Sequence, residues 1–431
     1  MAGYYRGLSH IRLTRVEEER EAKPIVPVGV GGDIGMYALM RAFHERYQIT
    51  GVVLSKVVTR FFQNSAIART VVVPEIDRPE VMVNALRRVA AKFPGARLVL
   101  LTNADWYVRA IVEHRAELAD LYWIPFCEKS TLDLISTKEG FAAVCDRIGL
   151  PTPRTVAVNI SELTPADVAA FDPGLPFPII GKPSSSADYY YVDFPGKAKI
   201  HHLRSRAELV DLLDRLVAAE YPGVFLLQEF IPGDETHMRS LTAYRDQSGQ
   251  TTLLASGHVL LEEHTPGTLG VPAAIRTKVM AEAMSDVTRF LDEVDYHGYA
   301  NFDCKVDDRS GELVFFEVNP RIGRNNYYAT AAGTNVAEPL VADLTGKPVS
   351  QPKQATGEVL YTVVAVRLLR HYLTGANLAA VNDLVRAKAV VNPLRYRGDR
   401  GRKRRLIVAA VRLNYWRKFR RHYARPTKTG F

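Results

Sequence analysis

Residues 300–321 read ANFDCKVDDRSGELVFFEVNPR, and this stretch carries the most distinctive pattern in the 431-residue sequence. Two runs rich in aromatic and β-branched residues, at 301–306 and 313–319, flank the polar segment DDRSGE. Apolar runs of this length on either side of a polar turn are typical of a β-hairpin. We therefore expect two antiparallel strands here, joined by residues 307–312.

One face of the expected hairpin is rich in oxygen-bearing side chains. Because side chains alternate along a strand, Asp303 falls on the same face as Glu317 and Asn319 of the partner strand. Cross-strand neighbours lie roughly 4.5–5.5 Å apart, so these three side chains can share one or two Mg²⁺ ions. Arg321 follows on that face and can bind phosphate oxygens bidentately. The opposite, apolar face is expected to carry Phe302, Cys304, Val306, Phe316 and Val318.

The alternative interpretation of this hairpin is an ordinary solvated charged face, which is the more common fate of charged residues. The composition of the polar face favours a metal site, since two carboxylates, an amide and a guanidinium gather above a strongly apolar face. The sequence therefore predicts Mg²⁺ binding at this hairpin.

Two segments upstream suit the binding of a phosphorylated ligand. FPIIGKP, at 177–183, places Lys182 at the end of an apolar strand, where it can neutralise phosphate charge; a lysine snorkelling from a strand end is the alternative. FLLQEFIPGDE, at 225–235, is a buried run followed by a turn. Its backbone groups suit an adenine edge and Glu235 suits ribose hydroxyls, while a plain strand-to-loop hinge is the alternative.

Residues 24–127 are expected to form an α/β domain. Four apolar runs, IVPVGV, GVVLSKVV, VVVP and ARLVLLTN, alternate with helical segments, which is typical of a parallel, doubly wound sheet. The first glycine turn does not complete the dinucleotide-binding pattern, because Ile34 takes the third glycine position. Ser55 and Lys56 stand where an acidic residue would bind a ribose. A nicotinamide-dependent oxidoreductase is therefore disfavoured.

The middle of the chain predicts an α+β region. A helix is expected to begin at Ser136, where Ser136 and Glu139 match an S-x-x-E capping box, and to end at Gly149. From there to about Lys347, strands and helices mix without strict alternation. This mixture is typical of α+β folds.

Composition sets the outer bounds. A chain of this length suggests about three domains, and 47% apolar with 24% charged residues is typical of a soluble globular protein. The three cysteines are odd in number and form no CxxC pair, which indicates neither a disulfide framework nor a zinc cage. The N-terminal segment lacks the apolar core of a signal peptide, so a cytoplasmic setting is expected.

The basic charge is concentrated at the C-terminus. From Arg386 onward there are 16 Lys and Arg residues and one acid, Asp399, a net +15, whereas the rest of the chain has 40 basic and 46 acidic residues, a net −6. Specific nucleic-acid binding by the body is not indicated. Three interpretations of the tail stay open: attraction to anionic lipid headgroups, a solvated and partly disordered segment, or, less favoured, nonspecific RNA binding. The apolar face of a helix here would carry Leu406, Ala409, Leu413, Trp416 and Tyr423, with Arg420 intruding.

In order and spacing, these segments and Lys138 resemble the ATP-grasp fold, in which two α+β subdomains clamp ATP. The resemblance covers about residues 130–345, and FEVNPR, at 316–321, is its most specific part. One departure is that Lys182 is followed by PSSSAD instead of a glycine-rich loop. The implied division is an N-terminal extension at 1–23, a pre-ATP-grasp domain at 24–127, an ATP-grasp domain at 128–348, and a C-terminal region at 349–431.

The resemblance implies a carboxylate–amine ligase. ATP and one or two Mg²⁺ ions are the expected cofactors, and Lys182 and Arg321 the expected catalytic residues. A carboxylate would take the γ-phosphoryl group of ATP, and an amine would then displace phosphate from the acyl phosphate. The resemblance places Lys138 and Lys182 at the phosphates, Glu229 and Ile231 at adenine, Glu235 at ribose, Asp303, Glu317 and Asn319 at Mg²⁺, and Arg321 at the transferring phosphoryl group.

Residues 29–56, GVGGDIGMYALMRAFHERYQITGVVLSK, resemble the start of D-aspartate ligases. Enzymes of that family attach D-aspartate, through its side-chain carboxylate, to the side-chain amine of a peptidoglycan precursor. A ligase for another amino acid or peptide, and a non-catalytic nucleotide-binding protein, are the alternatives. Membrane contact at the inner face would suit wall-precursor synthesis. Candidates for holding a substrate carboxylate are Arg239, Arg276, Lys305 and Arg324.

Overall fold

Two expected features lie largely outside the part of the chain that the structure describes. Only Lys23 of the N-terminal extension is described, and only Pro183 and Ser184 of the segment PSSSAD. The computed structural model describes residues 23–427 except 185–188, 190–191, 199 and 348–352.

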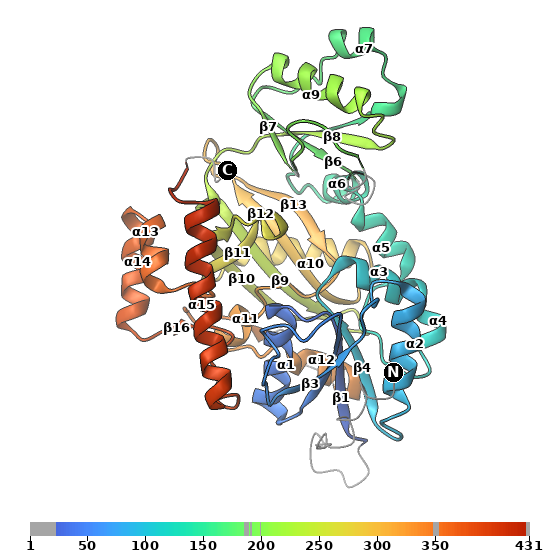
Figure 1. Ribbon diagram of the computed structural model, residues 1–431, viewed down its shortest axis with the longest axis vertical. Helices are drawn as coiled ribbons and strands as arrows, with labels where there is room; N and C mark the ends of the chain where they lie inside the picture. Colours follow the sequence, from blue (N-terminus) through green and yellow to red (C-terminus); the bar gives the residue numbers. More distant parts are fainter. Residues whose placement is uncertain (1–22, 185–188, 190–191, 199, 348–352, 428–431) are drawn as a thin grey trace.

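The first sheet is parallel and has four strands in the order β3-β2-β1-β4 (Figure 1). The central strand β1 is buried throughout. Ile25 belongs to one hydrophobic core and its neighbour Val26 to the other, so both faces of the sheet are covered. The expected parallel sheet is confirmed. Its elements are β1 (Ile25–Val30), α1 (Ile34–Tyr47), β2 (Gly51–Ser55), β3 (Ala68–Val72), α2 (Pro79–Ala90), β4 (Arg97–Thr102), α3 (Asp105–Glu113) and α4 (Arg115–Leu118).

A small antiparallel sheet in the order β5-β8-β6-β7 follows, at the top of Figure 1. Helix α9 covers it, with leucines at 209, 212, 213 and 216 fully buried in a core of their own. The elements are α5 (Lys129–Ser136), α6 (Lys138–Arg147), β5 (Thr155–Asn159), η3 (Ile160–Glu162), α7 (Pro165–Ala170), β6 (Ile179–Pro183), β7 (His201–Leu203), α9 (Arg206–Ala218) and β8 (Val224–Glu229).

The largest sheet has eight strands, in the order β13-β12-β9-β10-β11-β15-β16 with β14 paired to β10. Helix α10 packs on one face through Phe290, which contacts Phe302 of β12. The elements are η4 (Glu235–His237), β9 (Met238–Arg245), β10 (Thr251–Glu263), η5 (Pro266–Thr268), β11 (Val271–Thr277), α10 (Ala281–Glu293), β12 (Gly298–Val306), β13 (Leu313–Asn319), α11 (Tyr327–Ala331), α12 (Ala337–Thr345), β14 (Lys353–Gln354) and β15 (Leu360–Thr362).

Strands β12 and β13 form the expected hairpin, and Asp303 lies directly opposite Glu317. The next pair is Cys304 with Phe315, so Phe316 is an extra residue on β13. The expectation that Phe316 joins the core is therefore wrong: Phe315 is buried there, and Phe316 lines a cavity. A one-residue bulge exchanges the faces of the residues beyond it, which strict alternation cannot anticipate.

The expected helix start at Ser136 is wrong by two residues, because α6 begins at Lys138 and Ser136 ends α5. Thr137 is the N-cap of α6, and its hydroxyl accepts a hydrogen bond from the backbone N–H of Gly140 at 3.0 Å. Threonine caps a helix as serine does. The sequence pattern therefore located the start of this helix to within two residues but not the capping residue.

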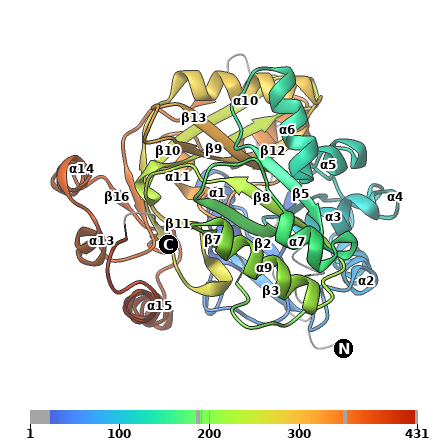
Figure 2. The same ribbon diagram turned by 90° about the horizontal axis from the view of Figure 1, so that it is seen from above.

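The C-terminal helix α15 packs against the body of the protein, so a wholly solvated tail is excluded for the described residues 402–422. Of the residues expected on one apolar face, Leu406, Leu413 and Trp416 are 72%, 56% and 38% exposed on α15, whereas Tyr423 lies just beyond the helix and is 6% exposed. Figures 1 and 2 both show α13, α14 and α15 together on one side of the molecule. The buried residues of α15 are Arg404, Val411, Tyr415 and Phe419. The region comprises α13 (Val366–Tyr372), α14 (Gly375–Arg386), β16 (Val390–Val391) and α15 (Arg402–His422).

Arg404 explains which face of α15 turns inward. Its guanidinium Nε lies 3.1 Å from Asp399 Oδ2, with both side chains 1% exposed. The guanidinium also lies over the ring of Tyr37 in α1, 4.7 Å from the ring centroid. A buried arginine requires such a partner, and the partner lies in another part of the fold.

Candidate active site

The main cavity, of about 920 Å³, lies where the small sheet and the eight-stranded sheet meet. Its volume is in the upper range of small-molecule sites. The lining includes nine of the expected site residues, contributed by α6, the small sheet, the eight-stranded sheet and the segment after β8. They are Lys138, Lys182, Glu229, Ile231, Glu235, Asp303, Lys305, Glu317 and Asn319.

The hairpin brings the expected magnesium ligands together. Asn319 Nδ2 donates to Asp303 Oδ2 at 3.0 Å, and Glu317 lies across the strand pair. Burial and the neighbouring Glu317 raise the pKa of Asp303. Lys138, whose Nζ lies 2.6 Å from Glu317 Oε2, lowers the pKa of Glu317. Two adjacent carboxylates repel one another, so a divalent cation between them would relieve a cost built into the site.

Hard oxygen ligands fit Mg²⁺ better than other metals. Among the described residues no cluster of three or more His, Cys, Asp or Glu side chains is present. Mg²⁺ is commonly held by one or two carboxylates, with substrate phosphates and water completing the octahedron. The pair of carboxylates with Asn319 meets that requirement.

Two lysines line the same cavity from different elements. Lys138 starts α6, and its Nζ also donates to the backbone carbonyl of Phe316 at 3.0 Å. Lys182 lies on β6, and its Nζ donates to Gln228 Oε1 at 2.9 Å. Gln228 was not singled out from the sequence, although it directly precedes Glu229. These cations give the cavity the positive charge that a polyphosphate requires.

Glu235 is held firmly at another part of the cavity wall, where it is 6% exposed. Its Oε2 accepts a hydrogen bond from the backbone N–H of Glu262 at 2.7 Å and contacts His264 Nε2 at 3.1 Å. Glu229 contacts Arg309 at 3.3 Å, and its backbone N–H donates to Arg154 O at 2.8 Å. His264 was missed from the sequence, because nothing near position 235 points to a residue 29 positions later.

Lys305 is 5% exposed and also lines the cavity. Its Nζ lies 5.3 Å from the ring centroid of Phe230. Burial lowers the pKa of Lys305 to about 8. Burial also raises the pKa of the Glu262 carboxyl, which lines the cavity and faces the Glu235 charge. Glu262 was not singled out from the sequence.

Arg321 joins the parallel-sheet region to the hairpin. Its Nε lies 3.0 Å from Asp105 Oδ1, and its Nη2 donates to Asn319 Oδ1 at 2.8 Å. Asp105 begins α3 and lines the main cavity. The sequence held no signal for Asp105, which lies 216 positions before Arg321.

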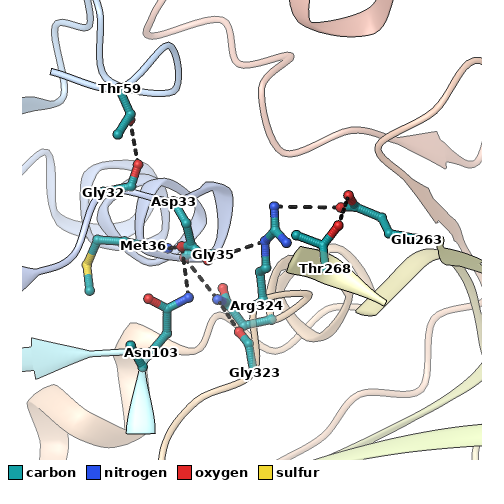
Figure 3. A network of polar contacts seen from close by, with 12 residues as sticks. Gly32, Asp33, Gly35, Met36, Thr59, Asn103, Glu263, Thr268, Gly323 and Arg324 are labelled. Atoms are coloured by element: carbon teal, nitrogen blue, oxygen red, sulfur yellow. Dashed lines mark hydrogen bonds and ion pairs between the residues drawn. The ribbon is translucent and has the colours of Figure 1, made fainter. Parts of the chain in front are cut away.

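The remaining carboxylate-binding candidates lie outside the lining of the main cavity. Arg276, on β11, contacts Glu358 at 3.2 Å. Arg239, on β9, donates to the backbone carbonyls of Thr236 and Met238. Arg324 contacts Asp33 Oδ2 at 3.3 Å and Glu263 Oε1 at 3.6 Å, as Figure 3 shows. The structure therefore does not bring Arg276 or Arg239 to the expected nucleotide site.

The architecture matches solved enzymes. An N5-carboxyaminoimidazole ribonucleotide synthetase in complex with ADP superposes with a TM-score of 0.55 at 15% identity, over 81% of this chain and 82% of that chain. The biotin carboxylase domain of the 2-oxoglutarate carboxylase of Hydrogenobacter thermophilus, with MgADP, ADP and bicarbonate, superposes with a TM-score of 0.56 at 15% identity, over 77% of this chain and 72% of that chain. These similarities establish the expected fold.

One protein of known activity is similar to this chain in sequence over nearly its whole length. D-Aspartate ligase of Enterococcus faecium (strain Aus0004) is 29% identical over 415 residues, which cover 94% of this chain and 98% of the relative. The chain therefore has the ATP-grasp fold and resembles a ligase in sequence over nearly its whole length. No protein-family profile matches the sequence. The resemblance inferred from residues 29–56 thus extends over nearly the whole ligase chain.

Proposed function

We propose that this ligase joins D-aspartate, through its side-chain carboxylate, to the side-chain amine of a peptidoglycan precursor, using ATP and Mg²⁺. The observation that carries the proposal is the end-to-end similarity to a D-aspartate ligase. The main cavity supports it, because the residues expected at phosphate, metal and ribose line that cavity, apart from Arg321. Solved structures of the same fold carry ADP, one of them with Mg²⁺.

The phosphate end of the nucleotide would lie beside the hairpin. Lys138 and Lys182 would neutralise the phosphate oxygens, which otherwise repel an incoming carboxylate. Asp303, Glu317 and Asn319 would hold Mg²⁺. When bound there, the ion supplies positive charge to the oxygens between which the phosphoryl group moves.

The other end of the nucleotide would lie at the loop after β8. Glu229 and Ile231 would frame the adenine, with backbone groups reading its edge. Glu235 would accept hydrogen bonds from the ribose hydroxyls, and its contacts with Glu262 and His264 fix its position before ligand arrives. A prepositioned acceptor lowers the ordering cost of binding.

The chemistry would proceed in two steps. A side-chain carboxylate oxygen of the amino acid attacks the γ-phosphorus of ATP, the bond to the β–γ bridging oxygen breaks, and an acyl phosphate and ADP form. The neutral amine then attacks the acyl carbon, the C–O bond to phosphate breaks, and the nitrogen loses a proton to give the amide. Arg321 would stabilise the transferring phosphoryl group from its place beside Asn319. Lys305 and Arg324 would be the candidates nearest the site for holding the second carboxylate of the amino acid.

We also propose that the protein contacts an anionic membrane from the cytoplasmic side. Leu406, Leu413 and Trp416 are 72%, 56% and 38% exposed on the outer face of α15, amid exposed basic residues. Apolar and aromatic side chains flanked by Lys and Arg suit the headgroup boundary of such a membrane. None of the described helices combines the length and apolarity needed to cross a bilayer.

The domain division expected from the sequence belongs to the same proposal. The pre-ATP-grasp domain would cover residues 24–127, the ATP-grasp domain 128–348 and the C-terminal region 349–431. Interdomain surfaces commonly hold ligands. In this division the main cavity lies within the ATP-grasp domain, with Asp105 reaching it from the preceding domain.

The test is ADP release across a panel of D- and L-amino acids, with and without a UDP-linked muropeptide bearing a lysine or ornithine side chain. D-Aspartate with the muropeptide is expected to give the highest rate. D-Alanine and D-serine are expected to fail by a wide margin, because a site built to pair a charge rejects analogues lacking it, often by about 10⁴-fold. Equal turnover with L-aspartate or a neutral amino acid would discard the D-aspartate assignment.

A further inference from the structure

A second cavity, of about 180 Å³, lies between α15 and the segment that follows β2. Its lining comes from three distant parts of the chain: residues 60–61, Arg324, and the inner side of α15. We call it the cationic cavity, because three of its lining residues carry a positive charge. They are Arg60, Arg324 and Lys418, and the lining also includes Phe61, Asn414 and Tyr415.

The cations of this cavity are held loosely by the protein. Arg324 lies 3.3 Å from Asp33 and 3.6 Å from Glu263, and Lys418 lies 3.4 Å from Glu263 (Figure 3 draws the two contacts of Arg324). Charge-assisted hydrogen bonds are usually about 2.7–2.9 Å long. The Nε atom of Arg324 is the atom that lies 3.3 Å from Asp33 Oδ2; it is buried and forms no hydrogen bond with the described residues. These guanidinium and ammonium groups therefore keep unused capacity to donate.

Positive charges outnumber negative charges around the cationic cavity. Two carboxylates, Asp33 and Glu263, face Arg324 and Lys418. Arg60 is exposed and forms no ion pair with any residue that the structure describes. Three cations against two acids leave an excess positive charge, which an anionic ligand group would neutralise.

The cationic cavity adjoins the nucleotide site. Glu263, which contacts Arg324 and Lys418, is the residue between Glu262 and His264 in the sequence. Glu262 lines the main cavity, and His264 contacts Glu235 there. Tyr423, just beyond α15, stacks on His264 with ring centroids 3.4 Å apart. Pro320 lines the main cavity and Arg324, four residues later, lines the cationic cavity, so their Cα atoms are at most about 14 Å apart. One ligand molecule can therefore reach both places.

We propose that the cationic cavity binds a carboxylate or phosphate group of a substrate whose other end reacts at the nucleotide site. The volume of the cationic cavity equals the volume that about six water molecules occupy in liquid water. A cavity of this size suits one anionic group or a small amino acid. Helix α15 then forms a wall of the active site. That the other end of the substrate reacts at the nucleotide site depends on the function proposed above. The anion site itself is inferred only from the cavity and its charges.

The kinetic test uses the full-length protein with Arg60→Gln and Lys418→Gln. The matched control is Arg417→Gln, which removes one charge from an exposed position on α15 outside the cavity. Loss of one charge-assisted hydrogen bond is expected to raise KM for one substrate about 10- to 100-fold. The kcat and the KM for ATP are expected to stay within about twofold, since Arg60 and Lys418 lie outside the main cavity. Arg417→Gln should behave as wild type.

The substrate whose KM changes identifies the source of the anionic group. A rise for D-aspartate alone assigns the cavity to its second carboxylate, and a rise for the UDP-linked muropeptide alone assigns it to an anionic group of the acceptor. Both outcomes support the proposal. Arg60→Gln is the cleaner variant, because no ion pair with the described residues is lost, and its melting temperature should match wild type.

Calorimetric titration with succinate tests the anion site without turnover. Succinate binding by wild type and Arg417→Gln, weakened about tenfold or more in Arg60→Gln and Lys418→Gln, would support the cavity even if no amino acid gave ADP. That combination would overturn the proposed function and leave the anion site standing. Unchanged KM values in both variants, or a wild-type protein that does not bind succinate, would overturn the anion site.

Discussion

The β12–β13 hairpin and helix α15 both carry charged and apolar side chains, yet the sequence predicts which polar residues meet on the hairpin and does not predict which residues of the helix are buried. In the hairpin, residues that face one another across the strands are fixed by local alternation, and Asp303 meets Glu317 as expected. In α15, the side that turns inward is chosen by distant partners such as Asp399 and Tyr37. Local pattern therefore determines a site built within one hairpin, and tertiary contacts determine how a helix docks.

The largest effect is expected at the hairpin. Glu317→Gln and Asp303→Asn should each lower Mg²⁺-dependent ADP formation at least about 10³-fold, because loss of a charged metal ligand removes several kcal/mol of transition-state stabilisation. Folding should survive, since Asp303→Asn also removes a carboxylate repulsion. Glu312→Gln, in the exposed turn of the same hairpin, is the matched control. Near-normal turnover in either site variant would show that these carboxylates do not hold the metal.

The docking of α15 is tested by stability. Arg404→Met should lower the free energy of unfolding by about 3–5 kcal/mol, because it leaves Asp399 buried without its cation. Arg405→Met, at the adjacent exposed position, should change it by less than about 0.5 kcal/mol. Urea denaturation of the two variants measures the difference. Equal midpoints would mean that α15 is not anchored through Arg404.

Lys305 of the hairpin is expected to make substrate binding depend on pH. Because burial lowers the pKa of Lys305 to about 8, the ammonium is charged below that pH and neutral above it. If Lys305 holds a substrate carboxylate, KM for the amino acid should be constant near pH 7 and rise about tenfold per unit well above pH 8. Lys305→Arg keeps its charge and should flatten this rise. Identical pH profiles for wild type and Lys305→Arg would remove Lys305 from substrate binding.

The smallest effect on turnover is expected on the outer face of α15. Leu413→Glu and Trp416→Glu should weaken cosedimentation with phosphatidylglycerol vesicles, and binding should fade with salt as charges are screened. Ligase turnover and stability should stay near wild type, because both side chains are exposed. Leu121→Glu, at an exposed leucine of the parallel-sheet region, is the control. Unchanged vesicle binding in both α15 variants would exclude the membrane role.

Surface substitutions are the appropriate probe of that role. Removing the C-terminal segment would also remove Tyr415 and Phe419, which are 4% and 3% exposed in a hydrophobic core. Truncation would therefore confound membrane contact with unfolding. The two faces of α15 can be separated only one residue at a time.

The sequence predicts the elements better than the contacts between them. The parallel sheet, the hairpin and the strand carrying Lys182 follow from local periodicity. The bulge at Phe316 does not, because an extra residue leaves no mark in composition. Asp105 and His264 were missed because their partners, Arg321 and Glu235, lie 216 and 29 positions away.

The central claim is that a carboxylate is activated as an acyl phosphate in the cavity beside the hairpin. The most direct measurement uses D-aspartate labelled with ¹⁸O in its side-chain carboxylate, with ATP and the muropeptide acceptor. Attack by a carboxylate oxygen on the γ-phosphorus transfers that oxygen to the phosphate finally released. Mass spectrometry should find one ¹⁸O atom in each phosphate, and none with Glu317→Gln, which should release no phosphate. Amide formation with unlabelled phosphate would contradict an acyl-phosphate mechanism.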